Sequence, residues 1–300
     1  MKHQLISVLP LLCLAFSVSA NTLYRDDGSQ IRYYIDNSQA KNLLVVFHGS
    51  DCNSVTHMGS VQTIWQEFMP EAALLTIEKY GIDASLPYEA GERTDCPADY
   101  LEHNSIAQRI EDGASVVNEL KHVYHHVSLA GGSEGGSIAL GVASKVDDIH
   151  SILVLNAGSS SFQHDIEYSI RQTVPEEEAD QVLQGFRQFA EQIKASEEAF
   201  EVEVSGHGYA FWKDALSRDL LEPLRQISVP VLIMQSAADE SVDPTATQRE
   251  VESIIASGAD NVELMMLPGL DHGFRDEDGN RHLSHSLRGA ATWLQRLSAN

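Results

Sequence analysis

Short apolar runs recur along the chain and predict strands. Residues 43–47 are apolar at every position, which is typical of a strand buried on both faces of a parallel sheet. Two strand-like stretches, 22–25 and 30–35, precede this run and are joined by a turn signal, Asp-Asp-Gly, at 26–28. The apolar pattern returns at 72–77, 126–130, 151–155, 229–234 and, more weakly, 262–267.

Helical periodicity fills the spaces between these runs. Ile106, Ile110 and Val117 fall on one helical face, and apolar residues at 283, 287, 290 and 294 share another. Alternating strands and helices predict an α/β fold, a doubly wound and mostly parallel sheet whose first two strands could pair antiparallel at the edge. Ligands of such sheets bind beyond the carboxyl ends of the strands.

One stretch of the chain, about 158–228, breaks the alternation. It has no strand pattern, and its acidic runs at 176–180 and 197–203 fit solvated helix faces. Connections in α/β units usually have about two to six residues, so we expect a helical cap insertion over the ligand edge of a single domain, 21–300. Its aromatic end, 206–212, could line a pocket. The alternative is that the insertion only extends the core.

The first twenty residues have the pattern of a secretory signal peptide. A short basic start is followed by an apolar run at 5–16 and by small residues ending at Ala20. The run is too short for a spanning helix, and no later run reaches membrane length. We therefore expect an exported protein, periplasmic or secreted, without a membrane span.

The composition limits the partners. The chain has 20 Lys and Arg against 44 Asp and Glu, a formal charge of −24, which argues against nucleic acid and anionic membranes as ligands. After removal of the leader, Cys52 and Cys96 are the remaining cysteines. An even number in an oxidising compartment predicts a disulfide between them, with two buried thiols as the alternative.

A glycine-rich turn surrounds one serine. The sequence Leu-Ala-Gly-Gly-Ser-Glu-Gly-Gly-Ser-Ile-Ala-Leu, 129–140, places Ser133 between a predicted strand and a predicted helix. A sharp strand-to-helix turn has no space for β-carbons around its central residue, which explains the glycines. It presents the hydroxyl above the sheet, with a helix N-terminus to stabilise negative charge. Ser133 is therefore the candidate nucleophile.

Partners for this serine follow in the expected order. Asp239 comes after the strand at 229–234, and His272 comes after the strand at 262–267. A serine nucleophile needs a histidine base, which needs an orienting carboxylate, and all three residues converge on one sheet edge. Asp243 is an alternative acid, but it precedes Pro244 and fits a turn.

The oxyanion of acyl transfer needs N–H donors. We expect these from Glu134, after the nucleophile, and from Ser50 in the loop after the strand at 43–47, with Asp51 as a weaker choice. The Glu134 side chain is either incidental or recognises a cationic group. No cofactor is expected. No metal is expected either, although histidines occur at 122, 125, 126, 282 and 285.

Taken together, these motifs resemble the α/β-hydrolase superfamily over nearly the whole chain after residue 20. Within it, the glycines around Ser133 and the spacing Asp239-x-x-Val242-x-Pro244 are similar to prolyl oligopeptidase-type peptidases and their small esterase relatives. Two departures matter: there is no space for a β-propeller, and the familiar His-Gly-Gly-Gly oxyanion motif is replaced at 48–51 by His-Gly-Ser-Asp.

The resemblance implies a serine hydrolase acting through an acyl-enzyme. We expect it to cleave ester bonds of small or medium acyl substrates. The alternatives are a prolyl oligopeptidase-like peptidase acting on short peptides, and a non-catalytic binding protein that keeps the fold.

Overall fold

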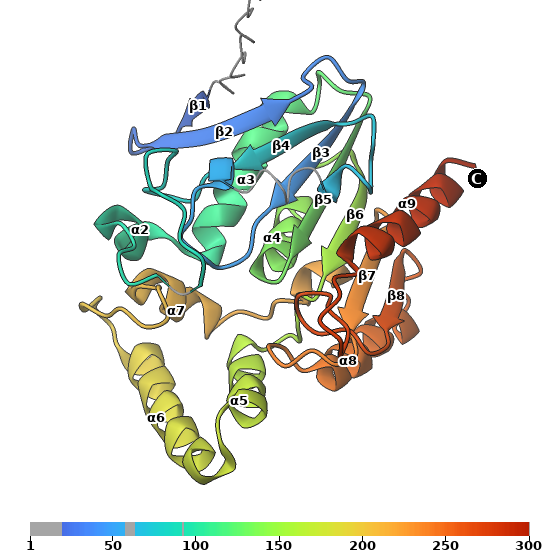
Figure 1. Cartoon of the computed structure of the whole chain (residues 1–300). Coiled ribbons are helices and arrows are strands. Elements are labelled where there is room, and N and C mark those ends of the chain that lie inside the picture. Colours follow the sequence, from blue (N-terminus) through green and yellow to red (C-terminus); the bar gives the residue numbers. More distant parts are fainter. Residues whose placement is uncertain (1–19, 58–63, 92, 300) are drawn as a thin grey trace, which may run out of the picture.

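The computed structural model describes residues 20–57, 64–91 and 93–299. They form an eight-stranded sheet with helices on both faces and strand order β1-β2-β4-β3-β5-β6-β7-β8 (Figure 1). The strands are β1 (Asn21–Tyr24), β2 (Gln30–Asp36), β3 (Asn42–Phe47), β4 (Ala73–Ile77), β5 (His126–Gly132), β6 (Ile149–Leu155), β7 (Val231–Ser236) and β8 (Val262–Leu267). Each predicted strand is confirmed to within two residues.

The sheet is mostly parallel, as predicted. β2 pairs antiparallel with both β1 and β4, and the remaining pairs from β4 to β8 are parallel. The parallel part therefore has one carboxyl edge, at which β3, β5, β6, β7 and β8 all end. The antiparallel β1–β2 hairpin forms one edge of the sheet. The prediction of a doubly wound, mostly parallel α/β sheet is confirmed.

Strand β3 shows why its sequence is apolar throughout. Leu43 and Val45 pack into a core on one face, while Leu44 and Val46 pack into a second core on the other. Successive side chains of a strand point to opposite faces, so a strand covered on both sides needs no polar position. The first core includes residues from α3 (Ile106–Leu120), α4 (Glu134–Ala143) and α8 (Pro244–Ala256), and the second includes residues from α9 (Leu283–Ala299).

Four helical elements separate β6 from β7. They are α5 (Phe162–Thr173), α6 (Glu176–Ala195), α7 (Tyr209–Ala215) and the 3-10 helix η2 (Glu222–Arg225). Figure 1 shows α5 and α6 as an antiparallel pair that projects beyond the carboxyl edge of the sheet. Three glutamates in the first turn of α6 lie near the positive end of its dipole. That this segment is a cap insertion with bounds near 158 and 228 stays a prediction.

The acidic run at 197–203 is not helical, so that part of the prediction was wrong. Helix α6 ends at Ala195, and other groups bind its last carbonyls. The ammonium of Lys213 donates to the carbonyls of Ile193, Lys194 and Ser196, and the Ser196 hydroxyl also donates to Ile193. From Ser196 the chain continues in an extended conformation.

The predicted signal peptide lies outside the described residues, except for Ala20. Within the part of the chain that the structure describes, no helix is both long enough and apolar enough to cross a membrane.

Candidate active site

Ser133 stands at the junction of β5 and α4 in a rare backbone conformation. Its φ is 54° and its ψ is −133°, and its N–H donates to the carbonyl of Leu155 at 2.8 Å. A β-carbon at Gly131 would lie 2.1 Å from the carbonyl oxygen of Gly135, and one at Gly135 would lie 2.0 Å from that of Phe47. The steric interpretation of these two glycines is confirmed. Gly132 differs, since a β-carbon there would meet nothing closer than 3.8 Å.

Asp239 and His272 are hydrogen-bonded across two loops at the same edge. The distance from Nδ1 of His272 to Oδ2 of Asp239 is 2.8 Å. Asp239 is buried, and its Oδ1 accepts the N–H groups of Ser241 at 2.8 Å and Val242 at 3.0 Å. Gln235 donates to Oδ2 at 3.2 Å. These donors orient the carboxylate so that one of its oxygens is directed at the imidazole.

Asp243, the alternative to Asp239 as the acid, has a different structural role. Asp243 caps helix α8 by accepting the N–H groups of Thr245 and Ala246, at 2.9 and 3.0 Å. Its other oxygen lies 2.9 Å from Nε2 of His164 in α5. The geometry therefore separates the two carboxylates: Asp239 faces His272, and Asp243 holds a helix N-terminus.

Ser133 and His272 are joined through the end of β6. Ser133 is bound to Leu155, and the next residue, Asn156, donates from Nδ2 to the carbonyl of His272 at 3.0 Å. Among the described residues, the Ser133 hydroxyl has no hydrogen bond to the His272 ring. Such contacts are often long in unliganded enzymes and tighten when substrate binds.

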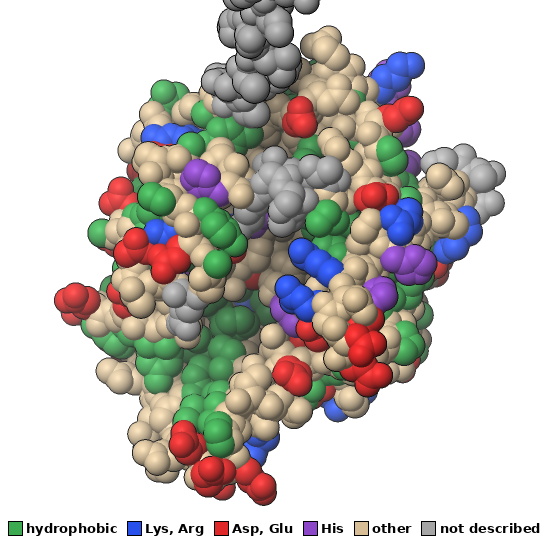
Figure 2. Space-filling view, in the orientation of Figure 1, with side chains coloured by type: hydrophobic (Ala, Val, Ile, Leu, Met, Phe, Trp, Pro, Cys, Tyr) green, Lys and Arg blue, Asp and Glu red, His purple; other side chains and the backbone are tan. Residues whose placement is uncertain are grey.

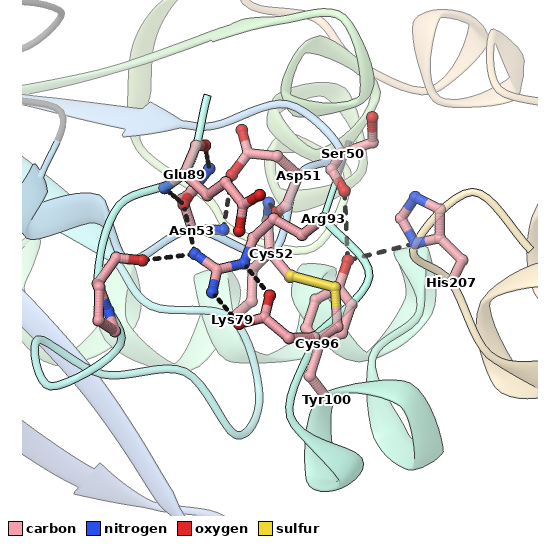
Figure 3. Close-up of a disulfide and its surroundings, with 12 residues drawn as sticks. Ser50, Asp51, Cys52, Asn53, Lys79, Glu89, Arg93, Cys96, Tyr100 and His207 are labelled. Atoms are coloured by element: carbon pink, nitrogen blue, oxygen red, sulfur yellow. Dashed lines mark hydrogen bonds and ion pairs between the residues drawn. A yellow bond between two sulfur atoms is a disulfide. The ribbon is translucent and has the colours of Figure 1, made fainter. Parts of the chain in front are cut away.

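The loop after β3 is anchored by its carbonyl groups. Arg109 donates to the carbonyl of His48 at 2.7 Å and to that of Gly49 at 3.4 Å. The Tyr100 hydroxyl donates to Ser50 at 3.2 Å, and the Lys79 ammonium donates to Asp51 (Figure 3). A β-carbon at Gly49 would lie 3.7 Å from that of Ser133, so this anchored loop runs beside the turn that bears Ser133.

Burial keeps several of these groups in defined protonation states. Burial lowers the pKa of Lys79 to about 8 and that of His48 to about 3, so His48 is a neutral imidazole at neutral pH. Burial also raises the pKa of the Tyr100 phenol above its ordinary value, which preserves the hydroxyl as a donor. Figure 3 shows this hydroxyl between Ser50 and His207, whose Nδ1 lies 3.2 Å away.

The side chain of Glu134 is directed to Arg109. The two form a buried ion pair, with side-chain exposures of 4% and 6%. The carboxylate therefore has a partner within the protein. The N–H groups of Ser50 and Glu134, the two expected oxyanion donors, donate to no other group in the described part of the chain, and neither does that of Asp51.

A disulfide joins Cys52 to Cys96, 44 residues apart. It attaches the long segment between β4 and α3 to the loop after β3 (Figure 3). Arg93, buried beside it, donates to Asn53 Oδ1 at 3.1 Å and pairs with Asp95 at 2.8 Å. The bond therefore lies two residues from Ser50.

The histidines that raised the question of a metal are dispersed. The ring centroids of His126 and His150 are 4.2 Å apart, and Nε2 of His282 lies 2.7 Å from Oδ2 of Asp276. No group of three or more His, Cys, Asp and Glu residues is arranged to hold a metal ion in the three described ranges.

An apolar groove of about 1120 Å³ lies between α2 (Ala98–His103), α7 and the extended segment after α6. Phe200, Val202 and Tyr209 line it, together with Leu101. Figure 2 shows hydrophobic side chains gathered over α7 and between α5 and α6. Tyr209 from the aromatic end of 206–212 lines this groove, but Ser133, Asp239 and His272 do not, and Phe211 and Trp212 are buried in the core. That this aromatic end lines a pocket at the ligand edge stays a prediction.

Sequence reasoning missed the residues that anchor the loop after β3. Lys79 and Tyr100 lie in a segment whose pattern gave no element, so nothing indicated where their side chains would point. Arg109 left a usable signal. It lies on the same predicted helical stripe as Ile106 and Ile110, and a charged residue within a buried stripe indicates an internal partner.

The parallel sheet, its carboxyl edge and the strand-to-helix turn at Ser133 define a serine hydrolase of the α/β-hydrolase superfamily. The family model described as BAAT / acyl-CoA thioester hydrolase C terminal matches residues 110–275, and the chain belongs to that family. A comparison with curated protein sequences gives no match.

Solved structures of similar fold include esterases, lipases and peptidases. Est1E from Butyrivibrio proteoclasticus has a TM-score of 0.59 at 17% identity, over 95% of this chain and 100% of that one. A Paleococcus ferrophilus monoacylglycerol lipase has a TM-score of 0.60 at 14% identity, over 90% of this chain and 99% of that one. A Mycobacterium tuberculosis puromycin-hydrolyzing peptidase has a TM-score of 0.59 at 16% identity, over 97% of this chain and 41% of that one. At these identities the likeness shows the fold alone.

Proposed function

We propose that this protein is an exported serine hydrolase that cleaves ester bonds of small or medium acyl substrates. Ser133, His272 and Asp239 are its catalytic triad. One observation carries the proposal: the 2.8 Å hydrogen bond between His272 and the buried Asp239, at the sheet edge where the Ser133 turn also lies.

In this mechanism the Ser133 hydroxyl attacks the acyl carbonyl while Nε2 of His272 takes its proton. The hydrogen bond from Nδ1 to Asp239 keeps the other ring nitrogen free to act as a base and stabilises the imidazolium that forms. His272 then returns the proton to the leaving alcohol. Water, activated by the same imidazole, releases the acid from the acyl-enzyme.

The oxyanion hole consists of the N–H groups of Ser50 and Glu134. The Ser133 carbonyl accepts the N–H of Gly136 at 2.9 Å, within the first turn of α4. Because the C=O and N–H of a trans peptide point in opposite directions, the Glu134 N–H points out of the helix N-terminus. An anion at that position also gains from the helix dipole.

Esters are preferred over peptides because the described residues form one sheet with its helices, and among them there is no separate domain that would select an extended peptide. The family includes acyl-CoA thioester hydrolases by its description, and a thioester would react through the same acyl-enzyme. Peptidases share the fold too. A panel of p-nitrophenyl esters, acyl thioesters and aminoacyl-p-nitroanilides separates the three classes; turnover of the anilides alone would overturn the preference.

The catalytic role is tested with a fluorophosphonate probe, which reacts with activated serines. Folded wild-type protein should be labelled at Ser133, and Ser133→Ala should be unlabelled and inactive. Equal hydrolysis by wild type and Ser133→Ala on every substrate would instead support a binding protein that keeps the fold.

Export is supported by the leader-like pattern before Asn21 and by the Cys52–Cys96 disulfide, which fits an oxidising compartment. The protein recovered from the periplasm or the medium should begin at Asn21. Recovery of an unprocessed chain from the cytoplasm alone would contradict export.

A further inference from the structure

Arg109 connects the two sides of the proposed oxyanion hole. Its guanidinium pairs through Nη1 with the carboxylate of Glu134, and through Nη2 it donates to the carbonyl of His48 at 2.7 Å. Nη1 also lies 3.4 Å from the carbonyl of Gly49. A single buried side chain thus contacts the residue after the nucleophile and the loop after β3.

The contact with Gly49 sets the direction of the Ser50 N–H. The Gly49 C=O and the Ser50 N–H belong to the same planar trans peptide and point in opposite directions. When Arg109 holds that carbonyl, the N–H must point away from Arg109. The Tyr100 hydroxyl holds the next carbonyl, that of Ser50, so the following peptide is fixed as well.

We propose that Arg109, held by the side chain of Glu134, is a positioning residue that aims the Ser50 N–H at the oxyanion. Glu134 then has two roles: its backbone N–H is one oxyanion donor, and its carboxylate fixes the arginine that orients the other. This inference rests on the proposed function, because it assigns a task within the same site.

The alternative is that the ion pair only stabilises the fold. Buried ion pairs are a weak source of stability, because desolvation offsets most of their attraction. The geometry also depends on the planar fork of arginine, which can bind a carboxylate and main-chain carbonyls at once, whereas the point charge of lysine cannot reproduce that arrangement.

Helix α3 offers a matched control. Arg25 forms a comparably buried pair with Asp112, three residues after Arg109 on the same helix, at 2.6 Å and with side-chain exposures of 13% and 4%. Its remaining hydrogen bonds go to Ser29 and Gln30, away from the loop after β3. Arg25→Lys therefore disturbs a buried arginine–carboxylate pair without touching that loop.

The experiment compares wild type, Arg109→Lys and Arg25→Lys in kcat, KM, melting temperature and fluorophosphonate labelling. Loss of an oxyanion donor typically lowers kcat about 100-fold to 1,000-fold, so a misaimed donor should lower it about tenfold to 100-fold. We expect that loss in Arg109→Lys with KM changed less than about twofold, and kcat close to wild type in Arg25→Lys.

Equal kcat in the two lysine variants, or an Arg109→Lys defect confined to KM, would overturn the inference. If Arg109→Lys does not fold, Glu134→Gln replaces it. Glutamine leaves Arg109 only one neutral acceptor in place of a charged partner, so its hold on the guanidinium is weaker and kcat should fall, while the backbone N–H of residue 134 is kept. An unchanged kcat in that variant would also overturn the inference. Failure of the proposed function looks different, because wild type itself would then show neither labelling nor turnover.

Discussion

The hydroxyl of Tyr168 donates a 3.0 Å hydrogen bond to the main-chain carbonyl of Asp239. Tyr168 belongs to α5, and Asp239 belongs to the loop after β7. Two further contacts join the same elements: the N–H of Asp243 donates to Asp165, and His164 pairs with Asp243. Helix α5 is therefore docked on the loop that carries the proposed catalytic acid.

The first prediction concerns Asp165, the buried member of this contact. Burial raises its pKa to about 6, above the ordinary 3.8. Because the folded chain holds this proton more firmly than the unfolded chain, the stability it contributes is fully present below about pH 4 and is lost as the pH rises through 6. Relative to Asp165→Asn, wild type should lose roughly 2 kcal/mol of unfolding free energy between pH 4 and pH 7.

Urea denaturation of both proteins at several pH values measures this difference. All other ionisable groups are the same in the two proteins, so their contributions cancel in the comparison to a first approximation. A constant difference between wild type and variant over this range would show that Asp165 does not titrate in it.

A second prediction separates the two aspartates of this loop. In Asp239→Asn the N–H groups of Ser241 and Val242 require an acceptor, so the amide oxygen should take their side and the NH2 should face His272. The ring is then forced into the tautomer that cannot act as a base, and kcat should fall about 10⁴-fold. Asp243→Asn should keep kcat within about threefold, because that residue caps α8.

Steady-state kinetics on the best ester of the panel, with circular dichroism to verify folding, checks both variants. A larger loss of kcat in Asp243→Asn than in Asp239→Asn would reverse the assignment.

The third prediction concerns the glycines of the turn at Ser133. Gly135→Ala places a methyl group 2.0 Å from the carbonyl oxygen of Phe47, and neither backbone segment can move without disturbing β3 or α4. We expect a loss of about 3 kcal/mol or more, or failure to fold. Gly132→Ala is the matched control, since its methyl group has space, and should cost about 1 kcal/mol or less. Thermal denaturation of the two variants should rank them in this order; equal stability would contradict the steric role of Gly135.

The fourth prediction concerns the disulfide. Closing a loop of this length contributes about 4 kcal/mol in the chain-entropy model. The double variant Cys52→Ala/Cys96→Ala should be less stable by an amount of that order, and dithiothreitol should bring wild type to the same midpoint in urea. If dithiothreitol lowered the midpoint of the double variant equally, the effect would not come from this bond.

Most of the fold followed from the pattern of apolar residues, because strands covered on both faces leave a continuous apolar run. Residues 43–47 and 151–155 are examples. The loops bearing Asp239 and His272 could be placed because parallel strands end at one edge. Helix α5 was not predicted: Phe162, Ile166 and Ile170 recur at every fourth position, but polar residues interrupt the stripe, and only the helix cap at Ser161 marked its start.

The side chains that anchor the loop after β3 could not be identified from the local sequence pattern. Tyr100 and Arg109 lie well before Ser133 in the sequence, and Lys79 lies inside the loop that the Cys52–Cys96 disulfide closes. They meet only in the folded chain, where they donate to the carbonyls of residues 48–51. A sequence pattern shows which residues are buried more readily than it shows which carbonyls they bind.

The backbone of Ser133 sets activity and stability against each other. A φ of 54° in a residue with a side chain costs about 1–3 kcal/mol, and glycine would adopt it at almost no cost. Ser133→Gly should therefore melt at a higher temperature than wild type while losing all hydrolysis. A lineage released from selection for hydrolysis would gain by discarding this serine first, and a laboratory screen for heat resistance alone would choose the same inactive protein.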